Sequence, residues 1–129
     1  KYDFIILDSP CSAVGTIRRN PEIFYKNKGP KFIDLVKIQE EMLEKASDLL
    51  NNNGIILYMV CSFLKKETED QINKFLSKKD SFKLFNFKSV IKNGTYNKVL
   101  KNNFMITLPD IIHNHKIDGY FAAYLKKIK

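Results

Sequence analysis

Two short segments each carry one of the only two cysteines of this chain, and each segment ends an apolar run. They are Asp8-Ser9-Pro10-Cys11-Ser12 and Tyr58-Met59-Val60-Cys61-Ser62. A thiolate is a strong nucleophile, and a cation or a helix N-terminus close to a thiol lowers its pKa. Asp8 stands at the end of its apolar run, where a carboxylate can bond to a bound ring. Two thiols at the exits of two buried strands predict a shared reactive site.

Three other roles for the two cysteines stay open at this point. A free cysteine is often a small buried hydrophobic residue, and neighbouring strands could bring two sulfur atoms close enough for a disulfide or a redox couple. Zinc could use both thiols with His113 and His115, but the sequence has no C-x-x-C or comparable ligand spacing. The two histidines are therefore predicted to be exposed turn residues, and no metal is expected.

Hydrophobic spacing defines the elements that must position these cysteines. A β-branched and aromatic run predicts a strand over residues 2–7, and a loop punctuated by Pro and Gly follows over residues 9–30. Loops of that length inside a compact domain are usually functional. Helical spacing predicts a helix over residues 34–50, with Asp34 as its cap and Asn51–Gly54 at its end. A second strand is predicted over residues 55–60.

The remaining residues complete a predicted alternation of strands and helices. A helix over residues 67–77 carries Glu67, Glu69 and Asp70 in its first turn, which suits the helix dipole. We further predict a strand over 81–87, a loop over 91–103, and strands over 104–108 and 120–126 joined by a turn-rich stretch. This order indicates an open α/β sheet with right-handed crossovers. Because ligands bind at the carboxyl ends of strands in such sheets, both cysteines are predicted to lie at the ligand edge.

Length and composition favour one globular domain. The chain has 129 residues, of which 44% are hydrophobic and 12% aromatic. No apolar run approaches the roughly 20 residues that span a bilayer, and no signal-peptide pattern opens the chain. Two cysteines do not make a secreted disulfide framework, so a reducing cytoplasm is expected. The chain opens at Lys1 and enters a strand at once, which predicts that an N-terminal part is missing.

The net charge of +8 favours a polyanionic partner such as nucleic acid. Lysine accounts for most of the 22 basic residues, so a compositional bias of the genome explains the bulk charge equally well. The two arginines are more specific, because they stand together as Arg18-Arg19 after the first cysteine. Arginine in a lysine-rich chain favours planar, bidentate contacts to phosphate or carboxylate.

At these residues the chain resembles the RNA cytosine-5 methyltransferases of the Sun/RsmB type. Residues 8–15, Asp-Ser-Pro-Cys-Ser-Ala-Val-Gly, resemble motif IV of that family, and residues 58–62 resemble motif VI. The run Arg-Arg-Asn-Pro-Glu-Ile at 18–23 is close to the Arg-Arg-His-Pro-Asp-Ile run of the RsmB subgroup. Ile38-Gln39, Leu108-Pro109 and residues 118–121 also match the C-terminal end of the family, so the resemblance covers nearly the whole chain.

The resemblance implies the C-terminal half of a Rossmann-like, S-adenosylmethionine-dependent methyltransferase sheet with flanking helices. Cys61 would attack carbon 6 of a cytosine, carbon 5 would take the methyl group, and Cys11 would assist proton removal and release. Asp8 would contact the exocyclic amine and ring nitrogen of the base. A base inside a helix is unreachable, so the implied substrate is single-stranded or flipped RNA, of the ribosomal type. Implied substrate contacts are Pro10, Ser12, Arg18, Arg19 and Ser62, and implied cofactor contacts are Asp8 and Pro10.

The chain departs from the family pattern in two ways. Val14 and Val60 replace the threonines of motifs IV and VI, and a valine lacks the hydroxyl that could hydrogen-bond there. The glycine-rich cofactor loop of the family is also absent from this sequence, whose five glycines are scattered. Residues 1–129 are therefore predicted to be a single partial domain without its cofactor-binding N-terminal half. The alternative is an inactive, truncated or split-gene remnant that at most binds RNA.

Overall fold

The structure is a computed structural model that describes residues 1–25, 29–89, 98–112 and 114–129. Its strands are β1 (Tyr2–Asp8), β2 (Leu50–Val60), β3 (Phe82–Phe85), β4 (Leu100–Lys101), β5 (Phe104–Thr107), β6 (Asp110–Ile112), β7 (His115–Ile117) and β8 (Tyr120–Lys127). The two α-helices are α1 (Phe32–Leu49) and α2 (Glu69–Lys78). Short 3-10 helices in the described residues include η1 (Val14–Thr16), η2 (Pro21–Tyr25), η3 (Lys65–Glu67) and η4 (Phe87–Ser89).

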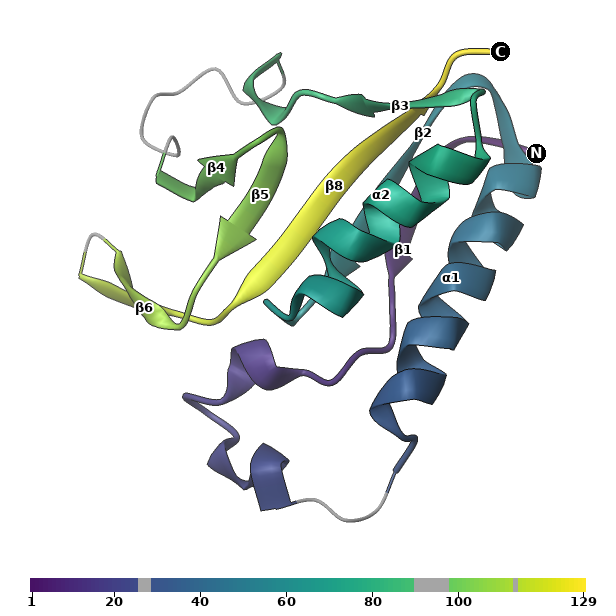
Figure 1. Cartoon of the computed structure of the whole chain (residues 1–129). Helices are drawn as coiled ribbons and strands as arrows, with labels where there is room; N and C mark the ends of the chain where they lie inside the picture. The colour runs from purple at the N-terminus through teal and green to yellow at the C-terminus, as the bar shows by residue number, and fades with distance from the viewer. Residues whose placement is uncertain (26–28, 90–97, 113) are drawn as a thin grey trace.

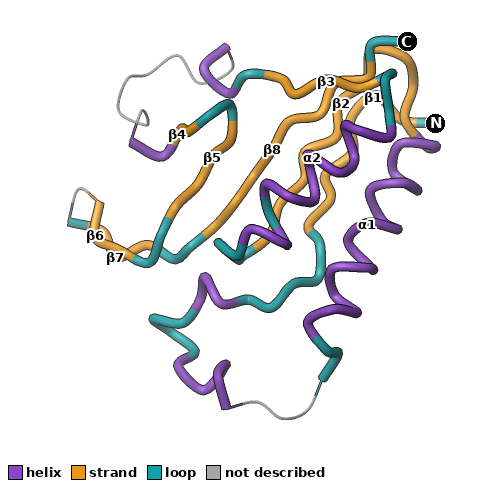
Figure 2. Tube along the Cα trace, viewed as in Figure 1, coloured by secondary structure: helices purple, strands orange, loops and turns teal. Residues whose placement is uncertain are grey.

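Six strands form one mixed sheet in the order β1-β2-β8-β5-β4, with β3 also paired to β8. β1 and β2 are parallel, and β8 runs antiparallel to β2, β3 and β5. β2 and β3 therefore point the same way, with β8 between them. Figures 1 and 2 show β8 crossing the middle of the sheet. The predicted α/β class is confirmed, but β3 joins the sheet through β8 and not beside β2.

Both helices cover the same face of the sheet, and the core lies between them and the strands (Figure 1). Side chains alternate along a strand, so every second residue of β2 faces the helices. Ile56, Tyr58 and Val60 are those residues, and each is 0% exposed. Their helical partners in the core cluster include Leu43, Ala46, Ile72 and Phe75.

The opposite face of β1 is exposed. Tyr2, Phe4 and Ile6 alternate with the inward residues of β1, and their exposed fractions are 60%, 47% and 62%. β1 also has β2 as its single neighbour in the sheet, so it is an edge strand. This edge of the sheet therefore exposes apolar surface.

Two predicted helix boundaries are wrong. Lys31 occupies the cap position of α1 and makes no side-chain capping bond, while Asp34 lies inside the first turn. Asn51–Gly54 does not end the helix as a turn, because β2 begins at Leu50 directly after α1. The left-handed Asn53 (φ 63°) instead falls in this first part of β2, where the pairing of β1 with β2 shifts register.

Smaller differences concern loops and turns. The predicted loop 9–30 contains η1 and η2, Glu67 lies in η3 before α2 begins, and the turn-rich stretch before β8 contains the hairpin β6–β7. The loop prediction for 91–103 falls largely outside the described residues, and residues 100–101 form β4. His113 also lies outside them, and His115 is an exposed strand residue of β7. Within the described part of the chain, none of the helices has the length and apolar character needed to cross a membrane.

Candidate active site

The two cysteines meet where the parallel strands β1 and β2 end. Asp8 pairs with Met59 in the ladder, and the next amide, that of Ser9, donates to the Met59 carbonyl at 3.0 Å. The register therefore continues into the two loops and places the Sγ atoms of Cys11 and Cys61 3.3 Å apart. Both cysteines are free thiols and half-buried. The predicted meeting of the two thiols is confirmed, while their chemical roles stay predictions.

The two thiols differ in acidity. The hydrogen bond from Cys11 lowers the pKa of Cys61 to about 7, below the ordinary value of 9.0, against an opposing contribution from burial. The same contact raises the pKa of Cys11 well above its ordinary value, and burial raises it further. Cys61 is therefore the more acidic thiol of the pair, and Cys11 is the one that more readily keeps its proton.

Asp8 and Pro10 are exposed at the rim of the site where the two cysteines meet. The negative charge of Asp8 acts to raise the pKa of Cys61, so its carboxylate is close enough to interact with that sulfur. Among the described residues, no side chain forms an ion pair with Asp8. The Pro10 carbonyl accepts a hydrogen bond from Gln39 Nε2 at 2.9 Å, which ties the loop to α1.

A buried carboxylate that the sequence analysis missed stands behind the cysteines. Glu67 is 0% exposed, and its oxygens accept hydrogen bonds from both Ser12 and Ser62. Ser62 is itself 0% exposed, so its hydroxyl faces inward. From the sequence, Glu67 is predicted to lie with Glu69 and Asp70 in the first turn of a helix, where acidic residues suit the helix dipole. Nothing in that pattern signals that Glu67 is buried.

Gly15 and Gly119 attach the turn before β8 to the loop that carries Cys11. The Gly15 amide donates to the Cys61 carbonyl at 3.0 Å, and the Gly119 amide donates to the Gly15 carbonyl at 2.7 Å. A Cβ on Gly15 would lie 1.9 Å from the Gly119 carbonyl oxygen, so the backbones approach too closely for any side chain. The turn before β8 thereby holds the loop of Cys11 against the end of β2.

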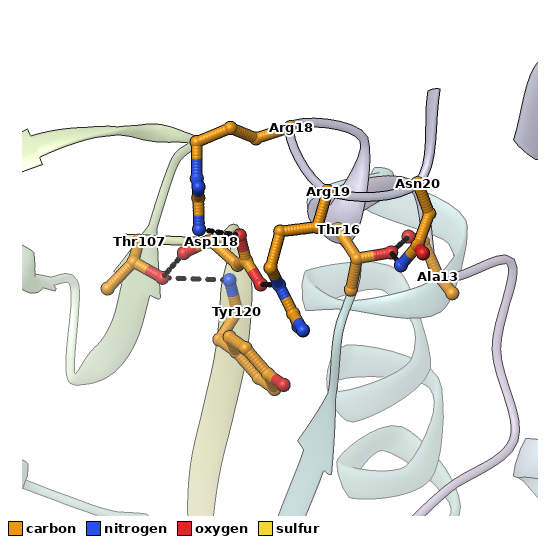
Figure 3. Close-up of polar contacts among 8 residues, drawn as sticks. All are labelled: Ala13, Thr16, Arg18, Arg19, Asn20, Thr107, Asp118 and Tyr120. Atoms are coloured by element: carbon orange, nitrogen blue, oxygen red, sulfur yellow. Dashed lines mark hydrogen bonds and ion pairs between the residues drawn. The ribbon is translucent and has the colours of Figure 1, made fainter. Parts of the chain in front are cut away.

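Arg18 and Arg19 approach the Asp118 carboxylate from two sides (Figure 3). Arg18 Nη2 lies 3.0 Å from one Asp118 oxygen, and Arg19 Nε lies 2.5 Å from the other. The Asp118 side chain is 7% exposed, and its backbone carbonyl accepts from the Thr107 hydroxyl at 2.8 Å. Of the two partners expected for these arginines, the structure shows a carboxylate within the chain, contacted through one nitrogen of each arginine and not bidentately. Their contact with RNA phosphate stays a prediction.

The two valines that replace the family's threonines are both buried. Val60 is 0% exposed at the end of β2, and Val14 lies at the start of η1. Each side chain belongs to the apolar interior of the domain. The missing hydroxyls therefore leave no buried polar atom without a partner at these positions.

Comparison with known proteins places the chain among ribosomal RNA methyltransferases. The family described as 16S rRNA methyltransferase RsmB/F matches residues 1–126. A probable ribosomal RNA small subunit methyltransferase B from Synechocystis is 31% identical over 97% of this chain, and the enzyme of that name from Shewanella oneidensis is 32% identical over 98%. In both comparisons the chain spans only 27% of the relative's length.

Solved structures show the same arrangement of elements. The crystal structure of PH0851 matches 97% of this chain with a TM-score of 0.78 and 35% identity. The crystal structure of NSun6 from Pyrococcus horikoshii with SFG matches 97% of it with a TM-score of 0.71 and 25% identity. The chain covers 26% of the first structure and 30% of the second.

Proposed function

Because the chain belongs to the RsmB/F family of 16S rRNA methyltransferases, we propose that it carries the base-modifying half of an enzyme that methylates carbon 5 of a cytosine in ribosomal RNA. The observation that carries this proposal is the thiol pair, with Sγ atoms 3.3 Å apart and pKa values shifted in opposite directions. One thiol is ready to attack, and the other is ready to act on the bond that the first one forms.

Cys61 acts as the nucleophile in this proposal. Its thiolate forms a bond to carbon 6 of the cytosine, which makes carbon 5 electron-rich. Cys11 lies 3.3 Å from the sulfur that must later leave. Once Cys61 is bonded to carbon 6, Cys11 gives up its own proton to solvent and takes the carbon-5 proton as a thiolate. The electrons of that carbon–hydrogen bond re-form the double bond between carbons 5 and 6 and release Cys61. Asp8 has no ion-pair partner among the described residues and is exposed, which leaves its carboxylate free for the amine and ring nitrogen of the base.

S-adenosylmethionine supplies the methyl group when it is bound. Asp8 and Pro10 are the residues of this chain that would contact it, because both are exposed at the carboxyl end of β1. SFG, an analogue of this cofactor, accompanies the similar NSun6 structure and supports the choice. Two rim residues form one side of a site at most, so the rest of the cofactor site must come from another segment.

RNA contacts in this proposal come from the loop after Cys11 and the rim beside it. Arg18 and Arg19 each use one nitrogen on Asp118, and a guanidinium has five N–H donors, so further donors remain for a phosphate. Pro10 is exposed in the same loop, while Ser12 and Ser62 support that loop through Glu67. The target cytosine would be single-stranded or flipped, and the protein would work in the cytoplasm, where it meets ribosomal RNA.

We propose that an N-terminal half, on the same or a separate chain, covers the exposed face of β1. Tyr2, Phe4 and Ile6 project from that face, and a groove of about 380 Å³ opens between β1 and α1. Edge strands and apolar patches of this kind usually have a partner in the complete protein. The relatives, whose length the chain spans by 27%, have ample further sequence to supply it.

RNA that contains 5-fluorocytosine tests the chemistry. Incubated with S-adenosylmethionine and the chain joined to the N-terminal part of a relative, it should form a covalent complex that survives denaturing gels. Cys61→Ala should abolish the complex. Cys11→Ala should still form it, and should also form it on RNA with ordinary cytosine, where the wild type releases its product and the variant does not. Equal trapping by Cys61→Ala would overturn the assignment of the nucleophile.

A methyl-transfer assay tests the division of labour. The chain alone should show no turnover, and activity should appear once the N-terminal part is added. Robust turnover by the 129-residue chain alone would contradict the proposal. No activity and no covalent complex in either sample would instead favour an inactive remnant that at most binds RNA. An in-frame glycine-rich loop in the DNA upstream of the Lys1 codon would support the active enzyme.

A further inference from the structure

Glu67 is a buried carboxylate whose four acceptor positions are all occupied. Oε1 accepts from the Ser12 amide at 2.7 Å and from Gln39 Nε2 at 3.1 Å. Oε2 accepts from the hydroxyls of Ser12 and Ser62, each at 2.5 Å. An ionised carboxylate offers about four lone-pair sites and no donor, so the four donors match it completely. A buried carboxylate is costly without such partners, which indicates that this arrangement has a use.

The donors come from three separate segments. Ser12 follows Cys11 in the loop after β1, Ser62 follows Cys61 at the end of β2, and Gln39 lies on α1. Glu67 itself is held at the end of η3, where its backbone carbonyl accepts from the Tyr58 hydroxyl at 2.8 Å. The Glu67 carboxylate therefore accepts hydrogen bonds from the residue that follows each cysteine.

The support continues behind Glu67. Gln39 is 0% exposed and donates to both Glu67 and the Pro10 carbonyl, so it fixes the other side of Cys11. Gln71 on α2 donates to Gln39 Oε1 at 3.2 Å and to the Val36 carbonyl at 2.6 Å. Both amide side chains are anchored to the helices, so the position of Glu67 is determined by the core and not by solvent.

Resting on the proposed function, we propose that Glu67 is a positioning residue that holds the Cys11 and Cys61 sulfur atoms in contact by clamping Ser12 and Ser62. The two thiols sit on different loops, and the Sγ contact alone is a weak hydrogen bond. Three of the four charge-assisted bonds to the Glu67 carboxylate come from Ser12 and Ser62, and they are a stronger link between those loops. Glu67 does not touch the base in this scheme and acts through the geometry of the thiol pair.

The direction in which the pKa of Cys61 moves distinguishes positioning by Glu67 from a simple effect of the Glu67 charge. The negative charge of Glu67 acts to raise the pKa of Cys61, so removing that charge alone would lower it further. The contact with Cys11 is the largest influence that lowers the pKa, so loosening the loops would raise it toward 9.0. Positioning and charge therefore predict opposite shifts for Glu67→Gln, which keeps the size of the side chain.

The test is the pH dependence of Cys61 alkylation by iodoacetamide in the 129-residue chain, with the site of labelling read by peptide mass spectrometry. The wild-type midpoint should lie near pH 7. Glu67→Gln should move it up by about one unit or more, which lowers the thiolate fraction at pH 7 about five-fold. Glu69→Gln, the same change two residues along, should leave the midpoint unaltered.

Ser62→Ala offers a milder variant should Glu67→Gln fail to fold, as judged by circular dichroism. It removes one of the four donors and should raise the midpoint by a smaller amount, while Ser62→Thr should restore it. A midpoint that falls or stays unchanged in folded Glu67→Gln and Ser62→Ala would overturn the positioning role. The measurement uses neither RNA nor cofactor, so its failure is separate from a failure of the methyl-transfer proposal.

Discussion

The two faces of the sheet differ in how completely the chain covers them. On the helical face, Ile56 of β2 is 0% exposed beneath α1 and α2. On the other face, Ile6 of the neighbouring strand is 62% exposed. The two isoleucines lie on adjacent parallel strands, yet one is in the core and the other is in solvent. The chain thus covers one face of this sheet with its helices and leaves apolar side chains of β1 exposed on the other.

Polar groups show the same contrast. In the cysteine corner, Glu67, Gln39 and Ser62 are buried and fully paired, and no buried side-chain nitrogen or oxygen among the described residues lacks a partner. At the rim, Asp8 is exposed on the uncovered side of the sheet. The residues around the two cysteines are held by internal contacts, whereas Asp8 at the rim has no ion-pair partner among the described residues. This difference predicts which substitutions the isolated chain will tolerate.

The largest expected effect on stability comes from shortening a buried side chain on the helical face of the sheet. Ile56→Ala should lower the free energy of unfolding by about 2–5 kcal/mol, because it leaves a cavity beneath the helices. Ile6→Ala should change it by less than about 0.5 kcal/mol in the isolated chain. Denaturant unfolding followed by circular dichroism measures both. Similar losses for the two variants would mean that the β1 face is already covered, for instance by a second copy of the chain.

Exchanging glycine and alanine at two positions in the loop after Cys11 should have the next largest effect on stability. Gly15→Ala places a Cβ 1.9 Å from the Gly119 oxygen and should cost at least about 1–3 kcal/mol through overpacking. Ala13→Gly should be neutral or stabilise by up to about 1 kcal/mol, because Ala13 has a left-handed φ of 57°. Unfolding midpoints of the two variants, two residues apart, give the comparison. A stable Gly15→Ala protein would show that the loop and the β8 turn can separate.

The smallest expected effect concerns the arginines at the rim. Asp118→Asn weakens two partly exposed ion pairs and should cost only about 1 kcal/mol or less. It also frees both guanidinium groups, so binding of a short single-stranded RNA at low salt should strengthen about two- to three-fold if they contact phosphate. Arg18→Ala and Arg19→Ala should each weaken that binding. Unchanged RNA affinity in all three variants would show that the arginines serve only to hold Asp118.

The meeting of Cys11 and Cys61 could be predicted because it depends on local rules. Each cysteine follows a short apolar strand, and one helix connects the two strands, so parallel pairing brings their carboxyl ends together. The acidic difference between the thiols could not be predicted in the same way. The difference in pKa depends on how deeply each sulfur is buried and on the contact between the two thiols, and neither follows from residue type.

The errors arise where the partner of a residue lies far away in the sequence. Asn53 keeps the left-handed φ that its residue type favours, but it lies at the irregular start of the β1–β2 pairing and not in a turn that ends the helix. Glu67 looks like a surface residue until Ser12, 55 positions earlier, is known to lie beside it. Arg18 and Arg19 favoured phosphate or carboxylate alike, and only the fold shows that Asp118 is within reach.

The position of β8 has a consequence for how the molecule is made. It is the strand nearest the carboxyl end of the chain, yet it lies between β2 on one side and β3 and β5 on the other. During synthesis β1, β2 and both helices leave the ribosome before β8, so the edge of β2 that β8 covers stays unpaired in the meantime. This part of the sheet therefore closes only when β8 arrives. Until then, that edge of β2 is open to other proteins or chaperones.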